Sequence, residues 1–190
     1  MGQAGVEALL QALRHDSVKV SRLAAYGLSV AGADAVAGLQ EALSDDRPET
    51  VVHAVFALGE LRHLASATVS ALNGLLDHSS ELVRRAVVET LSMIAAPQDA
   101  VVSGLIRCLQ DEDVQVRFMA GLSLSRMGAA ADAAVPYLET ALDDDNRYVR
   151  AHAAEALHYI GTPAAKDVLI DFLLRSRWCP TTTPQSTFYP

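Results

Sequence analysis

Apolar residues recur along the chain with helical spacing, and the same pattern returns at a nearly fixed interval. Between residues 149 and 160, the apolar positions fall on one stripe of a helix: Val149, Ala153, Ala156, Leu157 and Ile160. Equivalent leucines are separated by 30, 33, 33 and 33 residues: Leu28, Leu58, Leu91, Leu124 and Leu157. Such a period is typical of solenoids, whose stacked units share one continuous core. The pattern predicts about five repeats, which fill residues 6–161.

Each repeat is expected to form two helices joined by an acidic turn. The short first helices are predicted at Val36–Leu43, Val69–Leu76, Val101–Leu109 and Val135–Leu142. Aspartates of the turn can accept hydrogen bonds from the free N–H groups of the second helix. The second helices are expected to end at Gly32, Gly128 and Gly161, because glycine suits a left-handed C-cap.

The end of the chain departs from this pattern. The segment Ala164–Arg175 predicts a closing helix, and from Ser176 the composition turns rich in Thr and Pro. The predicted fold class is therefore all-α: an α-solenoid of five helical hairpins and a closing helix over residues 1–175, followed by a tail at 176–190. Because the tail carries Trp178, Phe188 and Tyr189, it is expected either to cap the last helix or to dock on a partner.

Two motifs in the repeats resemble a known family. The turn Asp113-x-x-Val-Arg117 and the helix Ala153-Ala-x-Ala-Leu-x-x-Ile-Gly161 resemble HEAT-like repeats of the subtype named after phycobilisome lyases. The resemblance covers about 155 of the 190 residues. It implies a short α-helical superhelix with one of three roles: a bilin lyase subunit, an adaptor in phycobilisome degradation or a general scaffold.

The second helices carry a second stripe, which points away from the core and is expected to line the concave surface. Sets of equivalent positions in the five repeats are here called columns and are numbered by the fifth repeat. Columns 151, 152 and 155 supply the candidate partner-binding residues: Arg22, Leu23, Tyr26, His53, Phe56, Arg85, Glu89, Phe118, Met119, Leu122, His152 and Glu155. Contiguous exposed apolar residues indicate a binding surface. The alternative is that neighbouring first helices or the tail cover them.

The stripe and the turns also contain groups that could bind ions, but structural roles fit them better. His152 and Glu155 lie one helical turn apart, yet two ligands alone do not predict a metal site. The aspartate clusters lack the glycine and the terminal glutamate of a calcium-binding loop. Arg84, Arg117 and Arg150 could hold an anion such as a bilin propionate. The favoured interpretation is that they pair with turn carboxylates such as Asp113 or Asp145 and join adjacent repeats.

The two cysteines and the overall charge limit the classes of function. Cys108 is expected to be a small buried apolar residue, and Cys179 raises the alternative of a thiol or iron–sulfur function. Acidic residues outnumber Lys and Arg by 23 to 15, which argues against binding to nucleic-acid backbones. The longest stretch without a charged residue has 14 residues, too few to span a bilayer.

These observations favour a non-catalytic adaptor or scaffold that binds another protein on the concave face, with no cofactor required. If the family resemblance extends to biology, the partner is a phycobiliprotein in the cytoplasm of a cyanobacterium. The first alternative is a phycobiliprotein bilin lyase or lyase subunit, which would bind a bilin. The second alternative is an iron–sulfur cluster assembly factor that uses Cys179.

Overall fold

The computed structural model describes residues 2–176, and every regular element in that range is helical. Five pairs of helices follow one another, which confirms the predicted solenoid. The first helices of the pairs are α1 (Gln3–Leu13), α3 (Val36–Ala42), α5 (Val69–Gly74), α7 (Gln98–Cys108) and α9 (Val135–Ala141). The second helices are α2 (Val18–Val30), α4 (Pro48–Leu61), α6 (Glu81–Ile94), α8 (Val114–Met127) and α10 (Arg147–Ile160).

A closing helix, α11 (Pro163–Ser176), follows the fifth pair as predicted. Its last residue, Ser176, lies one position beyond the expected end of the closing helix at Arg175. The remaining tail, with Trp178 and Cys179, lies outside the described residues. None of the helices formed by residues 2–176 is both long and apolar enough to cross a membrane.

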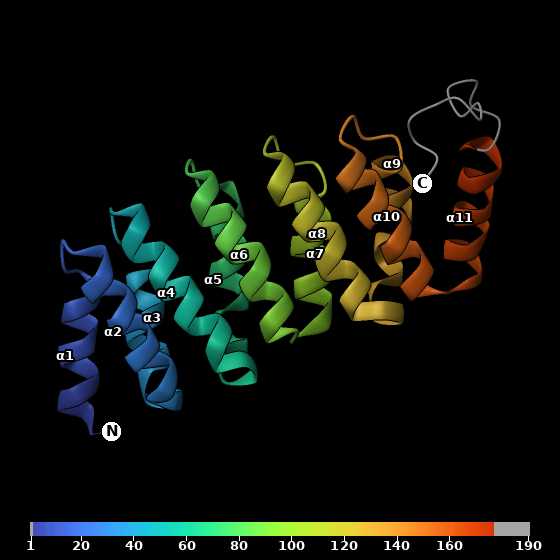
Figure 1. Ribbon diagram of the computed structural model, residues 1–190. Helices are drawn as coiled ribbons and strands as arrows, with labels where there is room; N and C mark the ends of the chain where they lie inside the picture. Colours follow the sequence, from blue (N-terminus) through green and yellow to red (C-terminus); the bar gives the residue numbers. More distant parts are fainter. Residues whose placement is uncertain (1, 177–190) are drawn as a thin grey trace.

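The helices form two layers (Figure 1). The second helices lie side by side in front, each packed on the next, and the first helices lie behind them. Short 3-10 segments connect some helices: Gly32–Ala35, Arg62–Thr68, Leu75–Asp77 and Gly128–Ala134. The chain runs from α1 at one end of the row to α11 at the other.

The core lies between the two layers and is built from the repeating leucines. The five second-helix leucines predicted from the period, from Leu28 to Leu157, are all fully buried. First-helix leucines face them and are also fully buried: Leu39, Leu72, Leu105 and Leu138. Each buried leucine stabilises the fold by roughly 1.5–3 kcal/mol relative to an exposed one. One helix pair offers too few such contacts, so the repeats stabilise one another.

The ends of the second helices differ in part from the prediction. Gly161 is a left-handed C-cap with φ 65° and ψ 7°, as expected. Gly128 combines φ 55° with ψ −136°, outside the left-handed helical region, because the chain turns directly into a 3-10 segment. The cap of α2 is Ala31, and Gly32, at φ 73°, follows it. Two residues other than glycine also take a positive φ, Arg62 at 52° and Ala95 at 53°.

Among the described residues, one turn aspartate acts as the predicted N-cap. The Asp113 carboxylate accepts hydrogen bonds from the backbone N–H groups of Gln115 and Val116 at the start of α8. In the fifth repeat the cap is Asn146, which accepts from the N–H of Tyr148. Asp144 instead accepts from the N–H of Asn146, so it stabilises the turn itself.

Two of the three arginines of column 150, Arg84 and Arg117, join consecutive repeats as the favoured interpretation predicted. The prediction is wrong for Arg150, which donates to backbone carbonyl oxygens of its own turn, because no further acidic turn follows α10 within residues 2–176. Arg84 binds Asp111 (Nε to Oδ2 2.8 Å) and Glu112 (3.0 Å) in the following turn. Arg117 binds Asp144 (2.8 Å) and Asp145 (3.1 Å) in the same way. Asp113 was expected to be such a partner but pairs instead with Arg85, the next residue along α6. Arg84 and Arg117 are thereby engaged by side-chain carboxylates.

Candidate functional site

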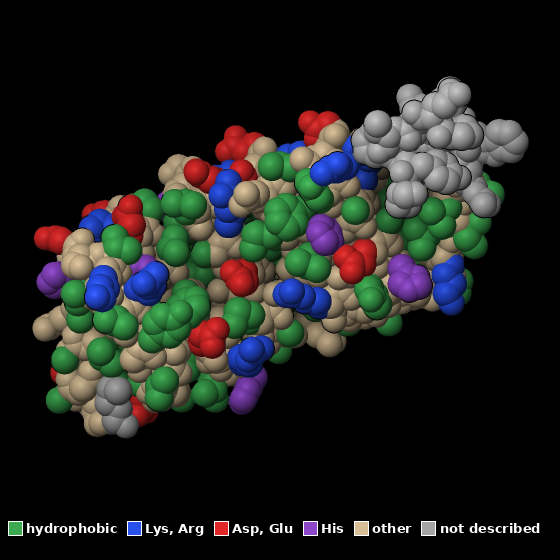
Figure 2. Space-filling view, viewed as in Figure 1, with side chains coloured by type: hydrophobic (Ala, Val, Ile, Leu, Met, Phe, Trp, Pro, Cys, Tyr) green, Lys and Arg blue, Asp and Glu red, His purple; other side chains and the backbone are tan. Residues whose placement is uncertain are grey.

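All twelve predicted partner-binding residues lie on second helices, and none is fully buried. Four are exposed, namely Arg22, Leu23, Tyr26 and Glu89, and the other eight are half-buried. We call this surface the second-helix face; Figure 2 shows it with apolar side chains distributed between charged ones. The structure places the residues on one surface of the molecule. Their role in partner binding stays a prediction.

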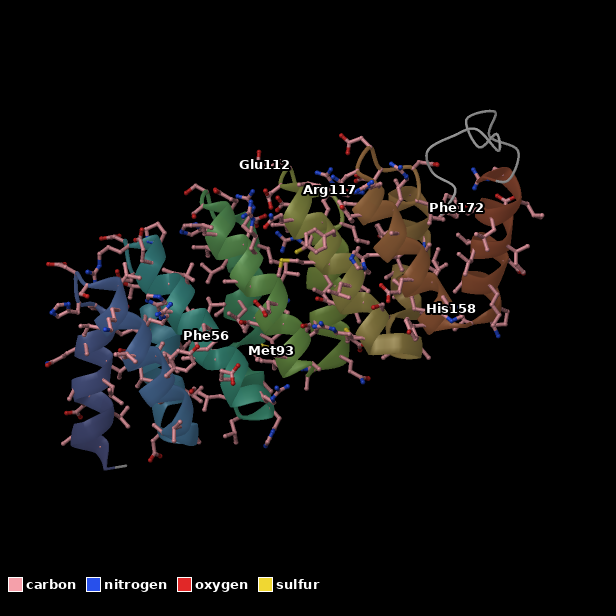
Figure 3. All side chains as sticks on the ribbon, viewed as in Figure 1. Phe56, Met93, Glu112, Arg117, His158 and Phe172 are labelled. Atoms are coloured by element: carbon pink, nitrogen blue, oxygen red, sulfur yellow. The ribbon has the colours of Figure 1, made fainter. Side chains whose placement is uncertain are left out.

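The apolar character of the second-helix face is strongest at its N-terminal end. Leu23 and Tyr26 on α2 are 59% and 51% exposed. The ring of Tyr26 meets that of Phe56 on α4 edge-to-face, with centroids 5.0 Å apart. Figure 3 shows the position of Phe56 on α4. The contact holds Tyr26 in place, so its exposed edge is a preorganised apolar surface.

Nearer the C-terminal end, the apolar residues are less exposed than expected. Phe118 and Met119 are half-buried and pack against the core. The neighbour that covers Phe118 is a second helix, since its ring stacks on that of His152 of α10 with centroids 5.6 Å apart. This cover differs from the alternative that the sequence predicts, which is cover by first helices or the tail.

A hollow of about 330 Å³ opens on the second-helix face between α8 and α10. Its lining is largely aromatic and apolar: Val114, Gln115, Phe118, Asn146, Tyr148 and His152. His152 is held by Glu155, whose Oε2 lies 2.8 Å from its Nδ1. Because a carboxylate can only accept, Nδ1 carries the proton in this contact. The ring of His152 is therefore held by two contacts, the ring of Phe118 and the carboxylate of Glu155.

Carboxylates border this hollow. A second hollow of about 440 Å³ shares Val114 and Asn146 with it and is also lined by Glu112, Asp113, Arg117 and Asp145. The side chains of Glu112 and Asp145 are 84% and 90% exposed. The hydrogen bond from Arg85 lowers the pKa of Asp113, and backbone N–H groups act in the same direction. An aromatic hollow with an acidic border suits an apolar side chain that has a basic neighbour.

Four of the six residues that line the hollow were missing from the sequence prediction: Val114, Gln115, Asn146 and Tyr148. Tyr148 is 54% exposed, and the Arg147 guanidinium lies 4.7 Å from the centre of its ring. On a helical wheel Tyr148 lies about 60° from position 151, within the outward stripe. The same periodicity could therefore have identified it one turn before His152.

His53 belongs to a polar contact at the other end of the second-helix face. The Ser21 hydroxyl donates to the carbonyl of Leu13 (2.6 Å) and lies 2.6 Å from His53 Nδ1. Since the hydroxyl proton is used by Leu13, His53 must donate to Ser21. Burial lowers the pKa of His53, the Arg22 charge adds to this, and Glu49 partly opposes it. The pair is a structural link between α2 and α4, because this histidine does not act as a base toward the serine.

Within residues 2–176, no group of three or more His, Cys, Asp or Glu side chains has the arrangement of a metal site. Cys108 is 3% exposed, as expected, and burial raises the pKa of its thiol to about 12. Cys179, on which the iron–sulfur alternative depends, lies outside the described residues.

Comparison with known proteins agrees with the repeat architecture. The profile of HEAT repeats matches residues 36–102, 72–145 and 102–178, which together cover more than half of the chain. The chain belongs to the HEAT-repeat family. No curated protein matches this HEAT-repeat chain.

Solved structures with the same fold include designed and natural repeat proteins. A chain from the complex of CpcE and CpcF of phycocyanin lyase from Nostoc sp. has 19% identity and a TM-score of 0.69, over 80% of this chain and 98% of that chain. A designed armadillo repeat protein in complex with the peptide (KR)4 has 21% identity and a TM-score of 0.65, over 89% and 88%. An engineered protein has 21% identity and a TM-score of 0.67, over 94% and 90%. At these identities the likeness shows the fold alone; the complexes with a peptide and between CpcE and CpcF are properties of those proteins.

Proposed function

We propose that this HEAT-repeat protein is a non-catalytic adaptor that holds another protein on its second-helix face. The observation that carries the proposal is the aromatic hollow between α8 and α10, with its border of exposed carboxylates. A partner would insert an apolar side chain beside Tyr148 and Phe118 and place a basic residue near Glu112 or Asp145. Leu23 and Tyr26 would provide a second apolar contact on the same surface.

The helical framework favours binding without rearrangement. Tyr26 is held by Phe56, and His152 is held by Phe118 and Glu155. Preorganised side chains lose little conformational entropy when a partner binds. The energy of the complex would come mainly from the apolar contacts, whereas the exposed carboxylates would contribute to orientation and association rate.

A phycobiliprotein subunit in the cytoplasm of a cyanobacterium is the partner that we propose first. Two observations support it: the motifs quoted above from the fourth and fifth repeats, and the likeness to a chain of the CpcE and CpcF complex of phycocyanin lyase.

The same likeness favours bilin lyase activity as a second candidate function. The structural match covers 98% of the chain from the CpcE and CpcF complex. The protein would then act as a lyase or lyase subunit, and a cysteine thiolate of the client would be the nucleophile that attaches the bilin. The contribution of the solenoid would be to hold client and pigment in position. The aromatic hollow would be the place for a bilin ring.

Binding of purified phycocyanin subunits, with and without free bilin, tests both functions. We expect saturable binding to the adaptor that Tyr148→Ala weakens and Tyr137→Ala leaves unchanged. Tyr137 is a matched control because it is 44% exposed but lies on the first helix α9. Covalent transfer of bilin to the subunit in the same mixture would identify a lyase. Equal binding by both tyrosine variants would show that the aromatic hollow between α8 and α10 is not the site.

A further inference from the structure

The row of arginines that joins the repeats ends without an acidic partner. Arg84 reaches carboxylates 27 and 28 residues later, and Arg117 does the same. Arg150 is the equivalent residue of α10. Its Nη1 donates to the carbonyl oxygens of Asp144 (2.6 Å) and Asp145 (3.0 Å), as the Nη1 of Arg117 does in its own turn. Among residues 2–176, no carboxylate lies within ion-pair distance of Arg150.

The surface of α10 beside Arg150 lacks the cover that the other second helices have. Column 154 is buried in the first four repeats, at Ala25, Val55, Val88 and Gly121. The next second helix covers each of them, and a Cβ on Gly121 would lie 3.2 Å from the Cβ of His152 on α10. Ala154, the equivalent residue of α10, is only half-buried, and Ala151 beside it is exposed.

The end of the row adds apolar surface. α11 follows α10 in the place of a sixth first helix, and no second helix follows it within the described residues (Figure 1). Ile170 and Leu174 lie one turn apart on α11 and are 55% and 54% exposed. The open end therefore combines the guanidinium of Arg150, the incompletely covered small residues Ala151 and Ala154, and the exposed apolar side chains of α11.

We propose that a helix of a partner protein docks beside α10, in the position that a sixth second helix would take. The helix would carry an apolar stripe, and the turn before it would place a carboxylate on Nε and Nη2 of Arg150. This is the chemistry by which Arg117 binds the turn before α10. Such bidentate contacts are charge-assisted and geometrically specific. The inference does not rest on the proposed function, since the end of the row is separate from the aromatic hollow.

Other occupants fit the site less well. Residues 177–190 contain no Asp or Glu, and Pro180 and Pro184 are incompatible with a continuous second helix. A second copy of the chain, stacked in the same register, would have to place its α1 where α11 already lies. A helix from a different protein meets neither obstacle.

A synthetic peptide tests the site directly. The probe is a fluorescently labelled peptide of residues 142–161 of this chain, which carries the acidic turn and the apolar stripe of a second helix. We expect its anisotropy to rise saturably with the full chain, and Arg150→Gln to weaken the binding about tenfold. Arg126→Gln is the matched control, since Arg126 is an exposed arginine of α8, and it should leave the affinity unchanged.

The peptide itself supplies the second half of the test. Changing Asp144 and Asp145 of the peptide to Asn should weaken binding to the unmodified protein, but not further reduce binding to Arg150→Gln. If Arg150→Gln lowers the melting temperature, Arg150→Lys replaces it, because lysine keeps the charge but loses the bidentate geometry. This variant should also bind more weakly than the unmodified protein.

Three results would overturn the inference. The first is no saturable binding, or equal binding by Arg150→Gln. The second is binding that appears only after Trp178→Ala, which would make residues 177–190 the occupant. The third is a dimer in sedimentation that Arg150→Gln dissociates, which would make the occupant a second copy. The effect of Tyr148→Ala on phycocyanin binding is a separate readout, so failure of the proposed function remains distinguishable.

Discussion

The guanidinium of Arg117 spans two repeats and holds Asp144, with Nε 2.8 Å from Oδ2 and Nη2 3.2 Å from Oδ1. Both side chains are largely shielded from water, at 15% and 12% exposed. Nη1 of the same arginine donates to the carbonyl oxygen of Asp111 in its own turn. One side chain therefore connects the turn before α8 with the turn before α10.

Removing this arginine should destabilise the protein. We expect Arg117→Gln to lower the free energy of unfolding by about 2–4 kcal/mol, because it leaves the shielded Asp144 without its cation. Arg107→Gln is the control: its pair with Asp77 is largely exposed, so the loss should stay below about 1 kcal/mol. Urea unfolding of both variants measures the difference. Equal losses would mean that the Arg117 pair contributes no more than a surface pair.

Protonation of the Asp144 and Asp113 carboxylates should destabilise the protein in acid. Burial opposes ionisation of Asp144, but the hydrogen bonds from Arg117 and from the N–H of Asn146 outweigh it, and its pKa is lowered. The pKa of Asp113 is lowered by Arg85. A carboxylate whose pKa is lower in the folded state stabilises the fold above its unfolded pKa, near 3.8, and loses that effect as the pH falls through the folded value.

The comparison of the unmodified protein with Asp144→Asn measures this contribution. Unfolding free energies at about pH 6 and about pH 2.5 should fall more for the unmodified protein than for the variant, because the variant has no group to titrate. An identical fall in both would show that Asp144 does not contribute to the acid sensitivity.

The repeat period made the fold predictable, and particular exceptions show where the sequence was insufficient. The anchor leucines and the Arg117 contact follow from spacing, because these positions meet similar surroundings wherever another repeat follows. The exposure of Phe118 was harder to predict, since it depends on how closely α10 packs on α8 and not on the position of Phe118 along its own helix. The partial exposure of Ala154 was also not predicted from its place in the repeat, because it arises from the lack of a second helix after α10 within the described residues.

Arg62 takes a backbone conformation that favours glycine. Its φ of 52° and ψ of −128° nearly match those of Gly128 at the equivalent position, φ 55° and ψ −136°. Residues other than glycine are strained there by roughly 1–3 kcal/mol. Arg62→Gly should therefore raise the free energy of unfolding by about 1 kcal/mol, although greater freedom of the unfolded chain offsets part of the gain. Gly128→Ala should lower it, and thermal unfolding measured for both variants checks the pair.

Cys108 should be unreactive in the folded protein. Its thiol is almost inaccessible, and a pKa raised to about 12 leaves only about one thiolate in ten thousand at pH 8. In a Cys179→Ser variant, alkylation by iodoacetamide should be slow in buffer and fast in urea, as followed by mass spectrometry. Rapid modification in buffer would mean that α7 opens easily to solvent.

The second-helix face should separate into residues that bind and residues that also support the fold. Leu23 is 59% exposed, so Leu23→Asp should leave the melting temperature nearly unchanged while weakening a partner that contacts α2. Phe56 packs against the core and against Tyr26, so Phe56→Asp should lower the free energy of unfolding by about 1–3 kcal/mol and weaken binding as well. Calorimetric melting and phycocyanin binding, measured on the same samples, give both values. If Leu23→Asp lowered the melting temperature as much as Phe56→Asp, the exposed end of the face would be part of the folding core and not a surface for a partner.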